Sequence, residues 1–136
     1  LISVFYKHLP TYNPQMSKGK PYKTNGRRER KASGFLSSGM VNIPRNNKGT
    51  RYPTTILDFP NSNAKRYHPT EKPINILSYL IKTYTNENEV VLDNCMGSGS
   101  TGVACVRNNR KFIGFELNGH YFEVAQKRIN NELDSL

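Results

Sequence analysis

The sequence predicts an α/β fold in which a parallel sheet is flanked by helices and joined to a basic, loop-rich N-terminal segment. Three observations support this: a strand, glycine turn, helix and strand in residues 90–116, apolar stripes at helical spacing around it, and an excess of Lys and Arg before residue 67. A length of 136 residues favours one domain. Two readable strands are too few for a doubly covered sheet, so the core is expected to be partial.

The centre of the prediction is a βαβ unit. The apolar run Val90–Leu92 predicts a strand that ends on Asp93, and a glycine-rich turn then opens a helix near Ser100. A second run, Phe112–Phe115, predicts a parallel strand that ends before Glu116. Because such strands end at one edge of the sheet, both carboxylates are expected there, where open α/β sheets bind ligands. Glycines let backbone N–H groups approach a ligand closely, so we expect a nucleotide-type cofactor.

Helices are predicted before, within and after this unit along the sequence. Pro73 suits the first turn of a helix that runs to about Tyr84, and the polar and basic run Asn108–Lys111 suits the end of the helix that follows the glycine turn. A last helix presents one apolar side. The positions that define these faces are Ile74, Leu77, Leu80, Ile81 and Tyr84, then Val103, Cys105 and Val106, then Tyr121, Val124, Ala125, Ile129 and Leu133. We expect Tyr84, Tyr121 and Phe122 to pack in the core rather than stack on bases.

Charge is distributed unevenly along the chain. Residues 1–66 hold 13 Lys and Arg and a net charge of +11, whereas residues 67–136 have a net charge of −1. The region Lys18–Lys48 lacks helical or strand periodicity and predicts a long surface loop suited to a phosphate backbone. Its candidate DNA-contacting residues are Lys18, Lys20, Lys23, Arg27, Arg28, Arg30, Lys31, Arg45 and Lys48. The alternative is a solvated linker without a ligand.

Several segments carry a family resemblance. HPTEKP at residues 68–73, DNCMGSGST at residues 93–101 and FIGFELNGHYFEVAQKRI at residues 112–129 resemble the C-terminal half of a DNA amino-methyltransferase of the permuted, beta-class kind, specific for adenine N6 or cytosine N4. FYKHLPTYNPQM and YPTTILDFPN resemble segments that precede HPTEKP in that family, and TYNPQM favours adenine by the same resemblance. The resemblance implies a partial Rossmann-like methyltransferase fold, S-adenosylmethionine as cofactor, and double-stranded DNA whose target base is flipped out.

The resemblance also assigns candidate cofactor residues. Glu116 would accept bonds from the ribose hydroxyls, and Thr70 and Lys72 would face the methionine end of the cofactor. Asn94 and Cys95 stand where the family usually has Pro and Phe. The full set of candidates is His68, Thr70, Lys72, Asp93, Asn94, Cys95, Gly97, Ser98, Gly99, Ser100, Thr101 and Glu116.

The family's catalytic motif, Asp, Asn or Ser followed by Pro-Pro and an aromatic residue, does not occur in the sequence. The nearest string, residues 58–61, has one proline and no following aromatic residue, so we expect a structural role for it and assign catalysis to no residue. We therefore expect a fragment that begins within a domain, lacks its N-terminal half and does not methylate alone. Residues 1–66 would form a strand and the target-recognition segment, and residues 67–136 the cofactor-binding half.

Two other functions fit parts of the sequence. Gly97, Gly99 and Gly102 followed by Glu116 satisfy the dinucleotide fingerprint of an NAD-binding oxidoreductase. A non-enzymatic DNA-binding remnant is the other alternative, and the departures at residues 94 and 95 favour it modestly. The sequence leaves open whether the chain forms a homodimer.

Other classes of protein are disfavoured. No apolar run approaches the roughly 20 residues that span a bilayer, and Lys7 and Pro10 interrupt the opening apolar segment too early for a secretory signal. We expect a soluble, cytoplasmic protein encoded by a bacterium or a phage. Cys95 and Cys105 lack the spacing of a zinc site and are expected to be reduced.

Overall fold

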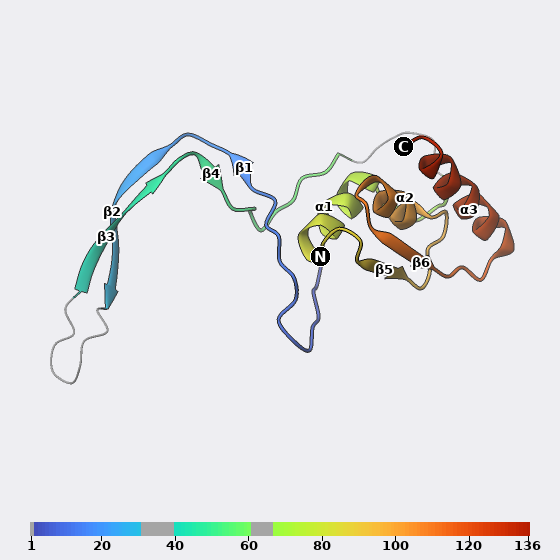
Figure 1. Cartoon of the computed structure of the whole chain (residues 1–136), viewed down its shortest axis with the longest axis horizontal. Helices are drawn as coiled ribbons and strands as arrows, with labels where there is room; N and C mark the ends of the chain where they lie inside the picture. The colour runs from blue at the N-terminus through green and yellow to red at the C-terminus, as the bar shows by residue number, and fades with distance from the viewer. Residues whose placement is uncertain (1, 31–39, 61–66) are drawn as a thin grey trace. The chain divides into compact units, whose positions relative to one another are not determined.

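The computed structural model describes residues 2–30, 40–60 and 67–136 and divides into two compact units (Figure 1). The first unit combines Leu1–Gln15 with Ile56–Leu136, and the second is Met16–Thr55. The sequence placed a boundary between residues 66 and 67. In the structure the opening segment and residues 56–60 belong with the C-terminal part of the chain.

The sheet of the first unit is a parallel pair of strands. β5 (Val90–Asp93) and β6 (Lys111–Gly114) are joined by α2 (Ser100–Arg107), and their register pairs Val90 with Lys111 and Asp93 with Gly114. The predicted βαβ unit is therefore confirmed. Because Asp93 lies opposite Gly114, the carboxyl ends of both strands reach the same edge of the sheet.

Three helices build the core against this sheet. α1 (Ile74–Tyr84) and α3 (Gly119–Leu133) each contact α2, which also contacts β6. The buried cluster consists of Ile81, Ala104 and Cys105, with Ile74, Leu77, Val91 and Phe112 packed against it. The predicted extent of α1 is confirmed, and the helices cover one face of the sheet.

The other face of the sheet carries apolar side chains that are exposed in the described part of the chain. Val90 is 54% exposed, Leu92 63% and Ile113 49%. Leu92 and Ile113 are directly paired across the two strands. Each strand therefore alternates between a half-buried residue on the helix side and an exposed residue on the other side.

Two packing predictions in α3 are wrong. Phe122 is 42% exposed and Leu133 is 53% exposed among the described residues, although both were expected to pack. Tyr121, Ala125 and Ile129 form the face that meets the rest of the unit, and Phe122 is turned about 100° away from it. Leu133 is the last residue of the helix.

The carboxyl ends of α1 and α2 are held together by one arginine. Arg110 donates from Nη2 to the carbonyl of Thr85 at 2.8 Å and from Nε to its hydroxyl at 3.0 Å. Asn109 has the left-handed φ of 57° common just after a helix. The N-terminal segment adds a bond from the Asn13 N–H to the Thr83 carbonyl at 2.7 Å. The polar run after α2 therefore ends that helix, as predicted, and anchors α1.

The second unit is a β-ribbon, which corrects the prediction of a long loop at Lys18–Lys48. β2 (Tyr22–Arg30) pairs antiparallel with β3 (Met40–Asn47), and an irregularity interrupts the register between Thr24 and Arg27. Two short strands, β1 (Ser17–Lys18) and β4 (Thr50–Arg51), also pair antiparallel, next to the end of the ribbon where Tyr22 lies opposite Asn47. A ribbon of two paired strands has no buried face that would impose alternation of apolar residues, so the periodicity rule missed it.

The base of the ribbon is fixed by a compact turn. The side chain of Asn47 accepts from the Gly49 N–H at 2.8 Å and from Arg51 Nη1 at 2.6 Å. Arg51 also lies over the Tyr22 ring at 4.6 Å, and the Gly19 N–H donates to the Gly49 carbonyl at 2.7 Å. Both strands thus leave the base from defined positions.

Candidate functional site

The glycine-rich turn after β5 is tied to the end of β6. The Phe115 N–H donates to the Asp93 carbonyl and the Met96 N–H donates to the Phe115 carbonyl, both at 2.9 Å. The Asp93 carboxylate accepts from the Cys95 N–H at 3.1 Å and from the Thr101 hydroxyl at 2.6 Å. The strand end, the turn and the first residues of α2 therefore form one hydrogen-bonded structure.

The second carboxylate, Glu116, reaches the same turn from two residues beyond the end of β6. Its Oε2 accepts from the Gly97 N–H and its Oε1 from the Asn118 N–H, each at 2.9 Å. The hydrogen bond from Asn118, together with that from Gly97, holds the pKa of the Glu116 carboxyl below its ordinary value. The two carboxylates predicted at one edge of the sheet thus both contact the glycine turn, and Glu116 is ionised at neutral pH.

Two glycines of the turn have backbone angles that other residues rarely adopt. Gly97 has φ of +53° and Gly99, the N-cap of α2, has φ of +78°. A Cβ on Gly99 would lie 2.8 Å from the Ala125 Cβ, so α3 packs directly behind the turn. A Cβ on Gly97 would lie 3.5 Å from the ring of His68. The turn is held between α3 and the HPTEKP segment.

The HPTEKP segment forms a turn before α1. His68 is half-buried and meets the Tyr121 ring edge-on, with ring centroids 4.3 Å apart. Its Nδ1 lies 3.2 Å from the Thr70 N–H donor and 3.1 Å from the Thr70 hydroxyl. Lys72 is exposed, and its Nζ donates to the Thr70 carbonyl at 2.9 Å. Of the candidates in this segment, His68 is brought to Gly97, whereas Thr70 and Lys72 lie on the exposed side of the turn.

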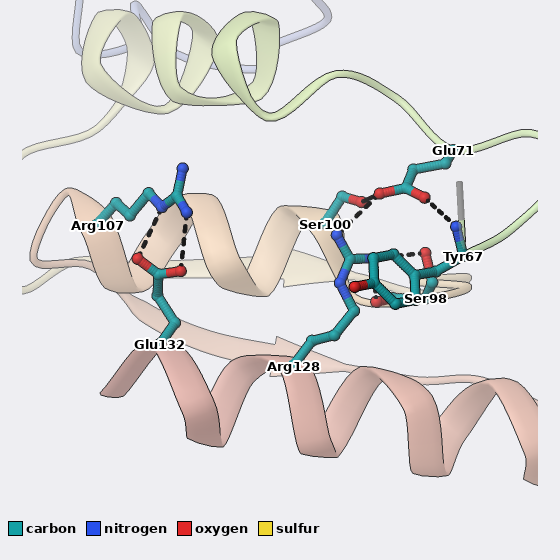
Figure 2. Close-up of polar contacts among 7 residues, drawn as sticks. All are labelled: Tyr67, Glu71, Ser98, Ser100, Arg107, Arg128 and Glu132. Atoms are coloured by element: carbon teal, nitrogen blue, oxygen red, sulfur yellow. Dashed lines mark hydrogen bonds and ion pairs between the residues drawn. The ribbon is translucent and has the colours of Figure 1, made fainter. Parts of the chain in front are cut away.

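A largely buried ion pair with its polar partners, which the sequence analysis missed, joins HPTEKP, the glycine turn and α3 (Figure 2). Arg128 Nη1 donates to the carbonyl and hydroxyl oxygens of Ser98, and Nη2 donates to Glu71, all at 2.8 Å. Glu71 also accepts from the Ser100 hydroxyl at 3.0 Å and the Tyr67 N–H at 2.8 Å. The Arg128 guanidinium lies 4.3 Å from the Tyr67 ring centroid. We call Tyr67, Glu71, Ser98, Ser100 and Arg128 the Arg128 cluster.

The Arg128 cluster keeps its acid ionised. Burial raises the pKa of Glu71, but the hydrogen bonds from Tyr67, Ser100 and Arg128 outweigh it and hold that pKa below its ordinary value. One signal for this cluster was present in the sequence. Arg128 follows Tyr121 by seven residues and so lies on the apolar face of the last helix, where a cation requires an acidic partner.

The other candidates of the turn differ in exposure. Asn94 and Cys95 are exposed, and Cys95 Sγ lies 3.5 Å from the Asn94 side-chain oxygen. Ser98 and Ser100 are buried, and their hydroxyls belong to the Arg128 cluster. Cys95 and Cys105 are free in the structure, and burial raises the pKa of Cys105 to about 11.

The candidate DNA-contacting residues lie on the second unit. Five of them have side chains that the structure describes, and all five are exposed: Lys18, Lys20, Lys23, Arg45 and Lys48. Arg27, Arg28 and Arg30 lie in β2, and Lys31 is outside the described residues. A hollow beside the irregularity in the ribbon is lined by Lys23, Thr24, Asn25, Pro44, Arg45 and Asn46. Of the described candidates, six therefore lie on paired strands, whereas Lys20 and Lys48 lie in the short connections between strands; the six are Lys18, Lys23, Arg27, Arg28, Arg30 and Arg45.

The structure also bears on metals, membranes and the string at residues 58–61. Within residues 2–30, 40–60 and 67–136, no group of three His, Cys, Asp or Glu side chains could hold a metal ion. No helix in the described part of the chain is long and apolar enough to cross a bilayer. Phe59 packs edge-on against Tyr79 with centroids 5.6 Å apart, a structural contact.

Comparisons with known proteins place these features in a family. The type II methyltransferase M2.LlaDCHI of Lactococcus lactis subsp. cremoris is 48% identical over 63 residues, which cover 46% of this chain and 23% of that protein. The DNA adenine methyltransferase YhdJ of Escherichia coli K12 is 32% identical over 93 residues, covering 65% and 32%. The chain thus spans about a quarter to a third of the length of these curated relatives.

Comparisons with solved structures and with family models lead to the same kind of protein as these relatives. The crystal structure of the M1.HpyAVI–SAM complex matches with a TM-score of 0.50 and 29% identity, over 85% of this chain and 63% of that one. The arrangement of parallel strands flanked by helices is therefore shared with the protein of that complex. A family model described as DNA methylase, N6_N4_Mtase, matches residues 1–127. The chain belongs to this DNA methylase family.

Proposed function

We propose that the chain is the cofactor-binding and DNA-contacting part of an S-adenosylmethionine-dependent DNA methyltransferase. The observation that carries the proposal is that Asp93, the last residue of β5, and Glu116, just beyond the end of β6, both bond to the glycine turn at one edge of the sheet. Open α/β sheets bind nucleotide-type ligands at this edge. Family membership and the likeness to a solved SAM complex support this cofactor over NAD.

The residues at this edge fit the proposed cofactor. Glu116 is ionised, so each of its oxygens has a second lone pair after accepting from Gly97 or Asn118 and can accept a ribose hydroxyl. Asp93 shapes the turn beside it. The ammonium of Lys72 has three donors, so donating to Thr70 leaves donors for the methionine carboxylate. When bound, S-adenosylmethionine supplies a methyl group on a positively charged sulfur.

The proposed acceptor is the exocyclic amino group of adenine, N6, with cytosine N4 as the alternative. The adenine specificity named for the relative YhdJ supports this choice, as does the resemblance of TYNPQM. In that segment, the Asn13 side chain donates to the Thr85 carbonyl at 3.2 Å, which joins it to the end of α1. A DNA substrate makes the bacterial cytoplasm the proposed place of action, for a host or a phage protein.

The proposed DNA-contacting element is the β-ribbon. A two-stranded ribbon is narrow enough to enter the major groove of a duplex, and lysines and arginines beside it would contact phosphates. Lys23 and Arg45 lie on opposite strands of the ribbon, and both line its hollow. Binding should therefore weaken steeply as salt is added.

The catalytic motif is proposed to lie in a further part of the same domain. The apolar side chains of Leu92 and Ile113 on the uncovered face of the sheet suit burial under additional elements. The chain also covers less than two thirds of the curated relatives and of the solved complex. This chain alone is then expected to bind the cofactor without transferring its methyl group, and sedimentation would show whether it forms a homodimer.

The cofactor proposal is tested by calorimetric titration of the chain with S-adenosylmethionine and, separately, with NAD. We expect binding of S-adenosylmethionine alone and at least tenfold weaker binding by Glu116→Ala, since a charged acceptor for two hydroxyls is lost. Glu123→Ala, which removes an exposed carboxylate on α3 outside the site, is the matched control. Preferential NAD binding would favour an oxidoreductase, and DNA binding without either cofactor would favour the non-enzymatic remnant.

The DNA proposal is tested by measuring affinity for duplex DNA across salt concentrations. Lys23→Ala should weaken binding and reduce the slope of log affinity against log salt by about one. Lys82→Ala removes an exposed lysine of α1, outside the ribbon, and should leave that slope unchanged. Equal effects of both variants would indicate a nonspecific response to net charge.

A further inference from the structure

The Arg128 cluster lies behind the proposed cofactor-binding turn. Ala125, Arg128 and Ile129 follow one another on the inner face of α3, and each meets a different residue of the turn or of α2. Ala125 lies against Gly99, Arg128 bonds to Ser98, and Ile129 lies against Gly102. Of these three contacts, only the one made by Arg128 is polar and directional.

Arg128 acts on one peptide group of the turn. Its Nη1 holds the Ser98 carbonyl oxygen at 2.8 Å, and the N–H of the same peptide group, on Gly99, donates to the Met96 carbonyl at 2.9 Å. Both ends of the peptide between Ser98 and Gly99 are therefore fixed. Gly99 has no Cβ to limit rotation of this peptide on the glycine side, and its φ is +78°.

Burial makes the Arg128 cluster costly to break. The Arg128 and Glu71 side chains are only 14% and 13% exposed. Removing one partner would leave an uncompensated charge in a site shielded from water, a far larger penalty than losing a surface pair. The planar guanidinium donates to Ser98 and Glu71 at once and stacks on Tyr67, which a lysine ammonium could not do together.

We propose that Arg128 is a positioning residue that sets the peptide between Ser98 and Gly99 and thereby the shape of the cofactor-binding turn. This inference rests on the proposed function, because it takes the glycine turn as the cofactor site. Glu71 and Tyr67 hold the guanidinium in place, so the HPTEKP segment and the turn are aligned through one side chain of α3 (Figure 2).

A second ion pair provides a matched control within the same two helices. Arg107 of α2 pairs with Glu132 of α3 at 2.7 Å, and their side chains are 48% and 19% exposed (Figure 2). This pair joins α2 to α3 at the far end from the glycine turn. Loss of this pair should weaken the packing of α3 on α2 without removing any contact to the turn. It therefore distinguishes a general weakening of α3 packing from a specific effect of Arg128 on the turn.

The experiment compares Arg128→Met, Arg128→Lys and Arg107→Met in the full 136-residue chain. Calorimetry measures the affinity for S-adenosylmethionine, and amide hydrogen exchange without cofactor measures the opening of the Gly99 N–H. We expect about tenfold weaker binding and about tenfold faster Gly99 exchange in Arg128→Met, since charge-assisted bonds are lost. Arg128→Lys should lie between this variant and the wild type, and Arg107→Met should match the wild type in both.

Each outcome decides the inference. Wild-type affinity and exchange in Arg128→Met would overturn it, as would equal losses in Arg107→Met, which would assign the effect to the docking of α3. If Arg128→Met does not fold, Arg128→Lys decides by the same two readouts. If the wild-type chain binds no S-adenosylmethionine, the proposed function fails, and the Gly99 exchange rates still decide whether Arg128 shapes the turn.

Discussion

Gly99 is a position where one added methyl group should disturb the glycine turn. It has φ of +78°, and a Cβ built there would lie 2.8 Å from the Ala125 Cβ and 3.0 Å from the Ala125 Cα. Apolar carbons normally approach to about 3.5–4.0 Å. Gly99→Ala must therefore either move α3 away from the turn or change the backbone of the turn.

Two separate terms set the size of the effect. The left-handed conformation costs an L-residue about 1–2 kcal/mol relative to glycine. Overpacking against a neighbour that cannot move freely costs about 1–3 kcal/mol more, and Ala125 is fully buried. We expect Gly99→Ala to lower the free energy of unfolding by about 2–5 kcal/mol, a large share of the total for a small domain.

Urea unfolding measures this loss of unfolding free energy, provided that the slope of free energy against urea concentration is the same in both proteins. A double-mutant cycle separates the backbone cost at Gly99 from the cost of overpacking against Ala125. Ala125→Gly removes the closest contact but not the unfavourable φ, so the pair should show a coupling of about 1–2 kcal/mol. Gly119→Ala is the control, because a Cβ there meets nothing within 4 Å and a helix prefers alanine. A change below about 0.5 kcal/mol in Gly99→Ala, or additive effects within the cycle, would refute this reasoning.

Three further predictions follow from the structure. The stabilisation that ionised Glu71 provides should be full above its ordinary pKa of 4.5 and lost as pH falls through its lower folded pKa. Unfolding measured as a function of pH should therefore show the wild type more stable than Glu71→Gln at pH 7, with this difference in unfolding free energy disappearing in acid. Iodoacetamide at pH 8 should label exposed Cys95 and not buried Cys105, whose pKa is about 11; mass spectrometry of a doubly labelled native chain would contradict this. Gly49→Ala should speed exchange of the Gly19 N–H, because a Cβ at φ +101° would lie 2.6 Å from the Gly19 carbonyl oxygen; unchanged exchange would argue against this packing.

The sequence sufficed for those parts of the molecule whose pattern is local. Val90–Asp93, the glycine turn and the strand before Glu116 were predicted because apolar runs bounded by a turn signal are read within a few residues. The meeting of Asp93 and Glu116 followed from topology, since parallel strands end at the same edge.

Other parts depend on contacts between distant residues. Arg128 and Glu71 are 57 residues apart in the sequence. The acid at helical spacing from Arg128 is Glu132, four residues on, and it pairs with Arg107 instead, so spacing alone does not identify Glu71 as the partner. The β-ribbon is stabilised by backbone pairing of Tyr22–Arg30 with Met40–Asn47, which needs no apolar alternation and leaves little trace in composition. Phe122 was misplaced because one residue along a helix changes the face by about 100°.

The length of the ribbon limits how many base pairs of a duplex it can lie against. The nine residues of β2 at about 3.3 Å each extend about 30 Å. Stacked base pairs rise about 3.4 Å each, so a ribbon laid along the groove would cover at most about nine base pairs. If the proposed DNA contacts are made through these strands, the part of the ribbon that the structure describes faces only a short stretch of duplex, whichever of its side chains make the contacts.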